Sequence, residues 1–140
     1  MPRRSPGEVR AQLPLRRTPR RRPTVIRGLS ASANRQIAVF ERRCGLSPGE
    51  VAHAFRRWSD TARRGGGNVE LFYTCEDADF HRDAYHVRTL LEAALHALRT
   101  RARRELRTAI DPVDERVLRR TLNNPSAHPD LPWWMRRIGV

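Results

Sequence analysis

The chain has no lysine, and all 28 of its basic residues are arginine. Arginine codons are rich in G and C, so a high-GC genome explains the missing lysine without selection. Codon usage does not explain a net charge of +13. A guanidinium group, unlike an ammonium group, binds phosphate through two parallel hydrogen bonds and stacks on flat rings. The composition therefore favours a polyanionic partner.

Cysteine and long apolar runs are also scarce. Cys44 and Cys75 are the only cysteines, and the N-terminus lacks the apolar stretch of a secretory signal. Two isolated cysteines in such a chain are typical of buried thiols in a reducing cytoplasm. The longest apolar runs fall far short of the roughly 18 residues that a membrane span needs. The sequence thus excludes a disulfide scaffold and a spanning protein, and we expect a cytoplasmic protein.

The positive charge is concentrated at the N-terminus. Residues 1–28 contain nine arginines and one acid, a net charge of +8, whereas residues 29–140 contain nineteen arginines and fourteen acids, a net charge of +5. Five of the ten prolines precede residue 24, apolar residues are few there, and like charges repel. This predicts a disordered basic arm over residues 1–28 and a single domain over residues 29–140.

The arm carries the first candidate interaction site. Its arginines occur in two clusters around Thr18-Pro19, namely Arg16, Arg17, Arg20, Arg21 and Arg22. In an extended chain these side chains would contact phosphates without reading bases, and the affinity would fall steeply with salt. The alternative is a solvated tail with no partner.

The domain reads as mainly α, with about four helices. The first helix is expected over residues 34–44, with Ile37, Phe40 and Cys44 on one stripe and Gly45 as a left-handed C-terminal cap. The preceding stretch, residues 24–26, is expected to lie extended on the body and anchor the arm.

The second helix is expected to begin at Ser47-Pro48-Gly49-Glu50, which matches a capping box with proline at the first helical position. Val51, Phe55, Trp58 and Ala62 form its apolar stripe. With the first helix it has the spacing of a helix-turn-helix, in which Arg56 and Arg57 would face a DNA groove. Against this, Glu50 would oppose phosphate and no third supporting helix precedes the pair. Any helical hairpin shows the same pattern.

Residues 69–75 alternate between apolar and polar side chains, as a strand does. A lone strand cannot satisfy its backbone, so it must pair with residues 24–27 or with a second copy of the chain, unless the segment is not a strand.

The third helix is expected over residues 77–108. Its apolar positions follow a near-heptad spacing: Phe80, Ala84, Val87, Leu91, Ala94, Leu98, Ala102 and Leu106. Acids begin it and arginines end it, which suits the helix dipole. Such a helix would be roughly 45 Å long, against a radius of gyration of about 14 Å for a compact body of this size. It therefore spans the body, breaks partway, or projects to meet another chain as in a homodimer.

Three arginines of this helix, Arg99, Arg103 and Arg107, fall on one face at i, i+4 and i+8, with Arg88 on the same side. They form a stripe suited to a phosphate backbone. The alternative is a solvated face with a favourable helix dipole.

A fourth helix is expected to begin with Asp111 as cap and Pro112 as its first residue, and to bury Val113, Val117, Leu118 and Leu122. The C-terminal segment is expected to dock as one short turn. One of its two tryptophans, Trp133 and Trp134, would fill the core, while the other would stack on a base or a protein partner beside Arg136 and Arg137.

A weak metal candidate lies on one helical face, where Asp79, Asp83 and His86 are spaced i, i+4, i+7. The alternative is an acidic helix start with one buried histidine. No second metal motif, no nucleophile–base pair and no nucleotide-binding loop stands out. We therefore expect no cofactor and no enzymatic activity.

The sequence favours a non-enzymatic protein that contacts nucleic acid, DNA or RNA, through the phosphate backbone. The partner would alternatively be an acidic protein surface. A second hypothesis is an adaptor or small homo-oligomer that uses the helix over residues 77–108 and the Trp133-Trp134 segment.

Overall fold

The computed structural model describes residues 24–64 and 78–139, with side chains from residue 86 onward in the second of these ranges. The N-terminal arm before residue 24, the strand expected at residues 69–75 and Cys75 lie outside the described residues.

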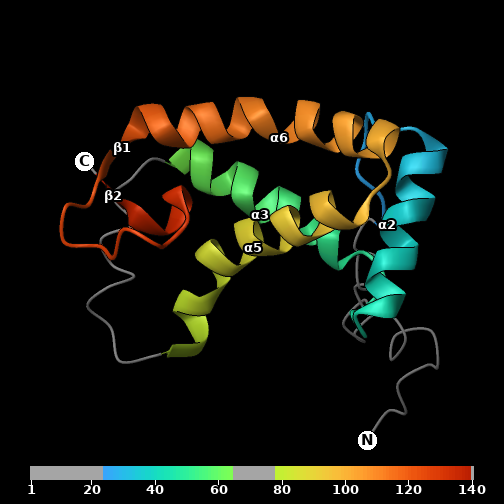
Figure 1. Ribbon diagram of the computed structural model, residues 1–140, viewed down its shortest axis with the longest axis horizontal. Coiled ribbons are helices and arrows are strands. Elements are labelled where there is room, and N and C mark those ends of the chain that lie inside the picture. The colour runs from blue at the N-terminus through green and yellow to red at the C-terminus, as the bar shows by residue number, and fades with distance from the viewer. Residues whose placement is uncertain (1–23, 65–77, 140) are drawn as a thin grey trace, which may run out of the picture.

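The described part of the chain is mainly helical, which confirms the expected fold class (Figure 1). Its elements are α2 (Ala31–Arg43), α3 (Glu50–Arg64), α5 (Ala78–Ala97), α6 (Thr100–Arg120), β1 (Thr121–Asn123), the short 3₁₀ helix η2 (Trp133–Arg136) and β2 (Arg137–Gly139). Helix α6 runs along one side of the molecule, α3 and α5 lie beneath it, and α2 crosses one end. Strands β1 and β2 pair antiparallel, with Leu122 opposite Ile138.

Helix α2 begins three residues before its expected start. Ser30 is the N-cap, and its hydroxyl accepts a hydrogen bond from the Ala33 N–H at 3.1 Å. At the other end Gly45 adopts φ +67°, and the Leu46 N–H bonds the Glu41 carbonyl at 2.8 Å, which confirms the expected left-handed cap. The prediction that Cys44 is a buried thiol on the apolar stripe is wrong, because its side chain is exposed beyond the last helical turn.

The start of α3 differs from the expected capping box. Gly49 has φ +87°, which is not helical, so α3 begins at Glu50 and Pro48 lies outside the helix. The cap comes from α2. The buried Glu41 carboxylate accepts hydrogen bonds from the N–H groups of Gly49 at 3.1 Å and Val51 at 2.9 Å. The negative charge that the start of α3 favours thus comes from a side chain of another helix, and the sequence around residues 47–50 does not indicate it.

The single helix expected over residues 77–108 is wrong. Helix α5 ends at Ala97 and α6 begins at Thr100, with Arg99 extended at φ −68°, ψ 159°. The break that was one of the three alternatives therefore occurs. The Arg103 guanidinium stabilises it by donating to the Leu95 and Leu98 carbonyls at 2.8 and 2.9 Å, at the negative end of α5.

The helix expected to start at Asp111-Pro112 is also wrong, because Pro112 lies inside α6. An interior proline removes one backbone hydrogen bond and costs about 3 kcal/mol, and burial on both sides of it outweighs that cost. Val113 and Val117 are buried as expected. Leu118 and Leu122 are 42% and 57% exposed, so their expected burial is wrong.

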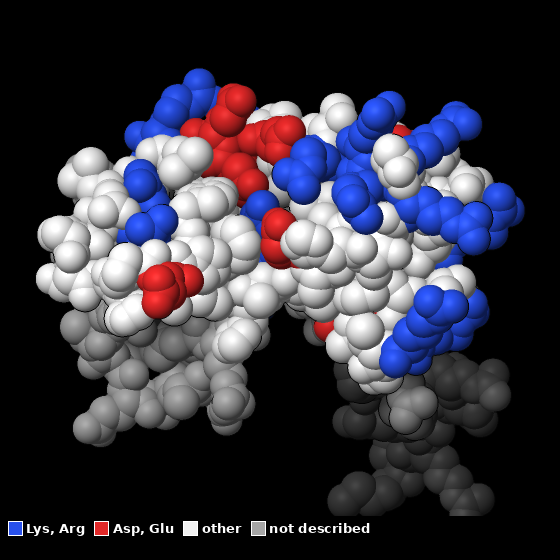
Figure 2. All heavy atoms as spheres, in the orientation of Figure 1, with Lys and Arg blue, Asp and Glu red and all other residues white. Residues whose placement is uncertain are grey.

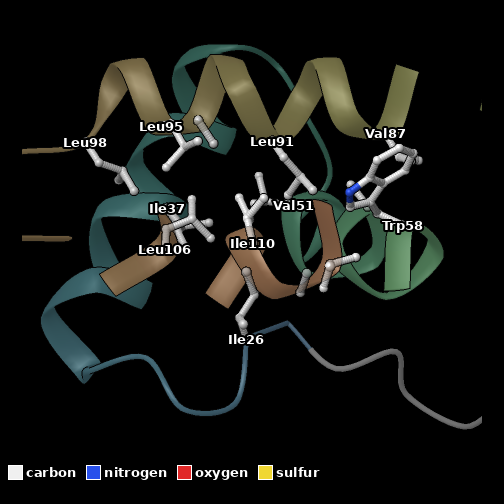
Figure 3. Packing of buried hydrophobic residues seen from close by; sticks show 14 of the residues in the cluster. Ile26, Ile37, Val51, Trp58, Val87, Leu91, Leu95, Leu98, Leu106 and Ile110 are labelled. Carbon is white, nitrogen blue, oxygen red and sulfur yellow. The ribbon is translucent and has the colours of Figure 1, made fainter. Parts of the chain in front are cut away.

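The core lies where all four described helices meet (Figure 3). Leu91 and Leu95 of α5, with Leu98 just after it, point toward α6 and α2, and Val51 and Trp58 of α3 lie beside them. The regularly spaced apolar residues of the expected long helix are therefore buried on both sides of the break, from Val87 to Leu106.

The segment before α2 is anchored as expected. Ile26 is buried in the core, and the Asn34 side chain binds its backbone by accepting from the Ile26 N–H at 3.0 Å and donating to the Ile26 carbonyl at 3.3 Å. The chain therefore enters the body beside α2.

Candidate nucleic-acid interface

Arginines gather at the end of the molecule formed by α2 and the start of α6 (Figure 2). The break after α5 places four of them in the first eight residues of α6, and α2 and the junction add others. The group comprises Arg35, Arg42, Arg43, Arg99, Arg101, Arg103, Arg104 and Arg107. All are exposed. We call this end the arginine surface.

The dipole of α6 opposes the arginines at its own N-terminus. The arginines of residues 101–107 were expected at a helix C-terminus, where the dipole favours cations, but they lie at the N-terminus of α6, and its first turn has no acid. The expected favourable dipole of the arginines' own helix is therefore absent, although the Arg103 guanidinium lies at the favourable end of α5. A local arrangement that disfavours its own helix is expected where a surface serves an interaction.

Two acids lie in α2 and the first half of α6, and both are bound by backbone donors. Glu41 caps α3, as described above. Glu105 accepts from the Ser30 N–H at 2.8 Å and the Ser30 hydroxyl at 3.1 Å. Its nearest cation, Arg101, is 92% exposed at 3.6 Å, a pair that stabilises little. These neutral donors leave the charge of both carboxylates in place, but the eight arginines outnumber the two acids and the surface stays positive.

The Ser30 contacts, followed by the charge of Arg101, hold the pKa of Glu105 below its ordinary value of 4.5. A carboxylate with a lowered folded-state pKa stabilises the fold above its unfolded pKa, and this stabilisation is lost as the pH falls through the folded pKa. We expect a Glu105→Gln variant to lose less thermal stability than wild type between pH 5 and pH 3, a range of about two units. Thermal melts at both pH values check this. An equal fall in both proteins would contradict it.

The sequence-derived stripe is only partly an interaction surface. Arg99 and Arg107 are exposed, but the guanidinium of Arg103 is held by the α5 carbonyls. Arg88, expected on the same side, is buried, so that prediction is wrong. The sequence reasoning missed Arg101 and Arg104, because it weighed only positions in line with Arg99. The dense run of arginines over residues 101–107 was the available signal.

A groove opens between α2 and the junction of α5 with α6. It measures about 400 Å³ and is lined by Ser32, Arg35, Gln36, Val39, Phe40, Arg43, Ala97 and Arg99. No acid lines it, and no lining arginine forms an ion pair with a described residue. The Arg99 N–H donates to the Gln36 side-chain oxygen at 3.0 Å, which fixes one wall. We call this the α2 groove.

A second, shallower hollow of about 690 Å³ lies on the other side of the α6 start. Its lining includes Gly28, Arg101, Arg104 and Glu105. Gly28 belongs to the segment over residues 24–28, so this described segment reaches the arginine surface. Arg16, Arg17, Arg20, Arg21 and Arg22 themselves lie outside the described residues.

The helix-turn-helix candidates lie on α3, which contributes no residue to this surface. Arg56 is exposed and Arg57 is half-buried. Helix α3 packs against both α5 and α6, which cover two of its sides.

The tryptophans and Arg88 form a structural cluster. Trp134 is buried, donates to the Thr89 hydroxyl at 3.1 Å and lies under the Arg88 guanidinium, 4.4 Å from its ring centre. This confirms that one tryptophan of the pair fills the core. Trp133 packs edge-on to Trp134 at 5.9 Å and beside Trp58 at 6.4 Å. Stacking of Trp133 on an outside partner stays a prediction.

Asp114 joins this cluster to α6. It accepts from the Arg88 Nε and Nη2 atoms at 3.0 and 2.9 Å and from the Trp58 Nε1 at 2.8 Å, while Glu92 accepts from the Arg88 Nη1 at 2.8 Å. Burial alone lowers the pKa of the Arg88 guanidinium, but the hydrogen bonds and charges of Asp114 and Glu92 outweigh it and leave the pKa raised. All three nitrogens of the Arg88 guanidinium thus donate to a carboxylate.

The metal candidates receive no support from the described side chains. His86 is exposed, and the side chains of Asp79 and Asp83 lie outside the description. Among the described residues, no group of three His, Cys, Asp or Glu side chains is placed to hold a metal ion.

No helix in the described ranges is long and apolar enough to cross a bilayer. Comparison of the chain with protein-family models, with curated protein sequences and with solved structures finds no match.

Proposed function

We propose that this protein binds nucleic acid through its phosphate backbone, without reading sequence, by means of the arginine surface together with the basic arm. The main support is the arrangement of charged side chains around the start of α6. Exposed arginines from α2, the junction and α6 meet there, while Glu41 and Glu105 are bound by backbone N–H groups.

The arm and the surface act on the same ligand in this proposal. The segment from Thr24 to Gly28 leads to the hollow beside Arg101 and Arg104. The net charge of +8 on residues 1–28 and the charges of the exposed arginines of the body therefore combine into one positive electrostatic potential. Guanidinium groups bind phosphate oxygens in pairs, and backbone phosphates carry no base information.

The adaptor hypothesis relied partly on apolar side chains that pack within the chain itself. Leu91 and Leu98 are 0% and 2% exposed within a single chain, and Trp134 is buried beside Arg88. These side chains contact their own fold, which favours the nucleic-acid proposal, while the stacking of Trp133 on an outside partner stays a prediction.

We expect Arg101→Gln with Arg104→Gln to weaken binding of duplex DNA or RNA about tenfold and to reduce the slope of log K against log salt by close to two, since each phosphate contact contributes about 0.9. Fluorescence anisotropy between about 50 and 200 mM salt measures both quantities. Deletion of residues 1–23 should reduce the slope further.

The matched control is Arg116→Gln with Arg119→Gln, which removes the same charge from exposed positions in the second half of α6. It should change the affinity less than the first pair. Absence of binding at low salt, equal losses in the two double variants, or binding unchanged by deletion of residues 1–23 would each overturn the proposal.

A further inference from the structure

The α2 groove has a composition that phosphate contact alone does not require. Arg35, Arg43 and Arg99 stand around it, but Val39, Phe40 and Ala97 contribute apolar lining between them. Val39 is 36% exposed, a sizeable apolar side chain left facing solvent among arginines. A duplex presents phosphates and grooves to such a surface and keeps the faces of its bases stacked.

We propose that the α2 groove receives an unstacked base of a single-stranded nucleic acid; this rests on the phosphate-binding function proposed above. Its volume of about 400 Å³ falls within the usual range for small-ligand sites. Single-strand binding combines aromatic platforms for bases with cations that track the backbone, and pockets for an unstacked base also use apolar side chains. The groove has both elements, and guanidinium groups at its rim can also stack on a base.

Gln36 supplies a polar contact at the same place. Because its side-chain oxygen accepts from the Arg99 N–H at 3.0 Å, the amide NH₂ of this groove-lining side chain remains as its donor. Carbonyl oxygens and ring nitrogens on base edges accept such a bond. The groove therefore offers an apolar wall for the flat face of a base, an amide donor for its polar edge and three guanidinium groups for the phosphates beside it.

Charge complementarity also admits an acidic peptide with an apolar side chain. The nucleic acid is favoured because the groove opens on the surface that residues 24–28 reach, and the arm holds its arginines in closely spaced clusters that match regularly repeated phosphates. The peptide is kept as an outcome of the test.

The experiment compares a single-stranded RNA of about 12 nucleotides with an RNA duplex of the same length, by anisotropy over a salt series. Counterion release favours the duplex, with a slope of about 0.9 per phosphate against about 0.7 for a single strand. Tighter binding of the single strand therefore reports a contact other than charge. We expect a preference of about fivefold for the single strand.

The variant is Val39→Gln, which removes the apolar wall without changing charge. It should lower single-strand affinity about fivefold, leave the salt slope unchanged and leave duplex affinity unchanged. The matched control is Leu118→Gln, an exposed apolar residue (42%) in the last turn of α6, which should change neither affinity. Circular dichroism and thermal melts confirm that both variants fold.

The outcomes separate the two proposals. If neither nucleic acid binds, the proposed function fails. If both bind but the single strand has no advantage, or Val39→Gln behaves as Leu118→Gln does, the inference alone fails. If a labelled acidic peptide with one phenylalanine binds more tightly than the single strand, and Val39→Gln abolishes that binding, the groove takes a protein and the inference is overturned.

Discussion

Replacement of Asp114 by alanine should lower the free energy of unfolding by roughly 3–5 kcal/mol, the usual cost of removing one partner of a buried ion pair. The Arg88 side chain is 4% exposed, and Asp114 accepts two of its donors together with the Trp58 N–H. Without the carboxylate, a buried cation and an indole N–H lose their partner at once. Glu92 alone, 26% exposed, cannot replace it.

The expected fall in melting temperature is at least roughly 12 °C, taking about 4 °C per kcal/mol for a domain of this size. Near-ultraviolet circular dichroism is a direct readout, because all three tryptophans of the chain lie in this cluster. Urea titration gives the free energy.

The matched control is Glu115→Ala, an exposed acid at the next position of α6, with an expected change within about 0.5 kcal/mol. A double change, Arg88→Met with Asp114→Leu, should cost less than Asp114→Ala alone, because it leaves no unpaired buried charge. A loss below about 1 kcal/mol for Asp114→Ala would show that water or another group reaches Arg88.

Apolar spacing predicted which residues are buried better than it predicted where helices end. The positions from Val87 to Leu106 are all core, as their spacing indicates, yet they belong to two helices. The break after Ala97 has no glycine or proline to mark it. It depends on Arg103 reaching back to α5 carbonyls and on Gln36 of α2 accepting from the Arg99 N–H, and both contacts exist only after the chain has folded.

At Pro112 the sequence indicated a helix start where the structure has none. Locally, Asp111-Pro112 has the form of a helix start, but α6 continues through it because Ile110, Val113 and Val117 are buried along one side. The tertiary gain outweighs the local preference. The same principle applies at α3, where a partner distant by ten residues, Glu41, caps a helix whose own start had the form of a capping box.

The sequence predicted the kind of surface that the candidate site forms, but not most of its residues. The sequence indicated phosphate contact by arginine and named Arg99 and Arg107, which are exposed. It could not place α2 beside the α6 start, so Arg35, Arg43 and the apolar wall of the α2 groove were missed. It also could not show that the two nearby acids are bound by backbone donors, because that depends on contacts such as Ser30 with Glu105, 75 positions apart.

Replacement of Glu41 by alanine should lower the free energy of unfolding by roughly 3 kcal/mol, since hydrogen bonds to a charged group contribute about 1.5–3 kcal/mol each and buried N–H groups are left without a partner. Its side chain is almost fully buried and accepts from the Gly49 and Val51 N–H groups. Urea titration measures the loss, with Arg42→Ala as a neighbouring exposed control.

Hydrogen exchange at the Val51 amide tests the cause of that loss. If Glu41 acts as the cap of α3, the Val51 amide should exchange faster in Glu41→Ala, by more than the global loss of stability accounts for. Glu41→Gln should fall between wild type and alanine, because its amide retains one acceptor oxygen but loses the charge that the α3 dipole favours. A glutamine variant as stable as wild type would show that the charge of Glu41 does not stabilise the start of α3.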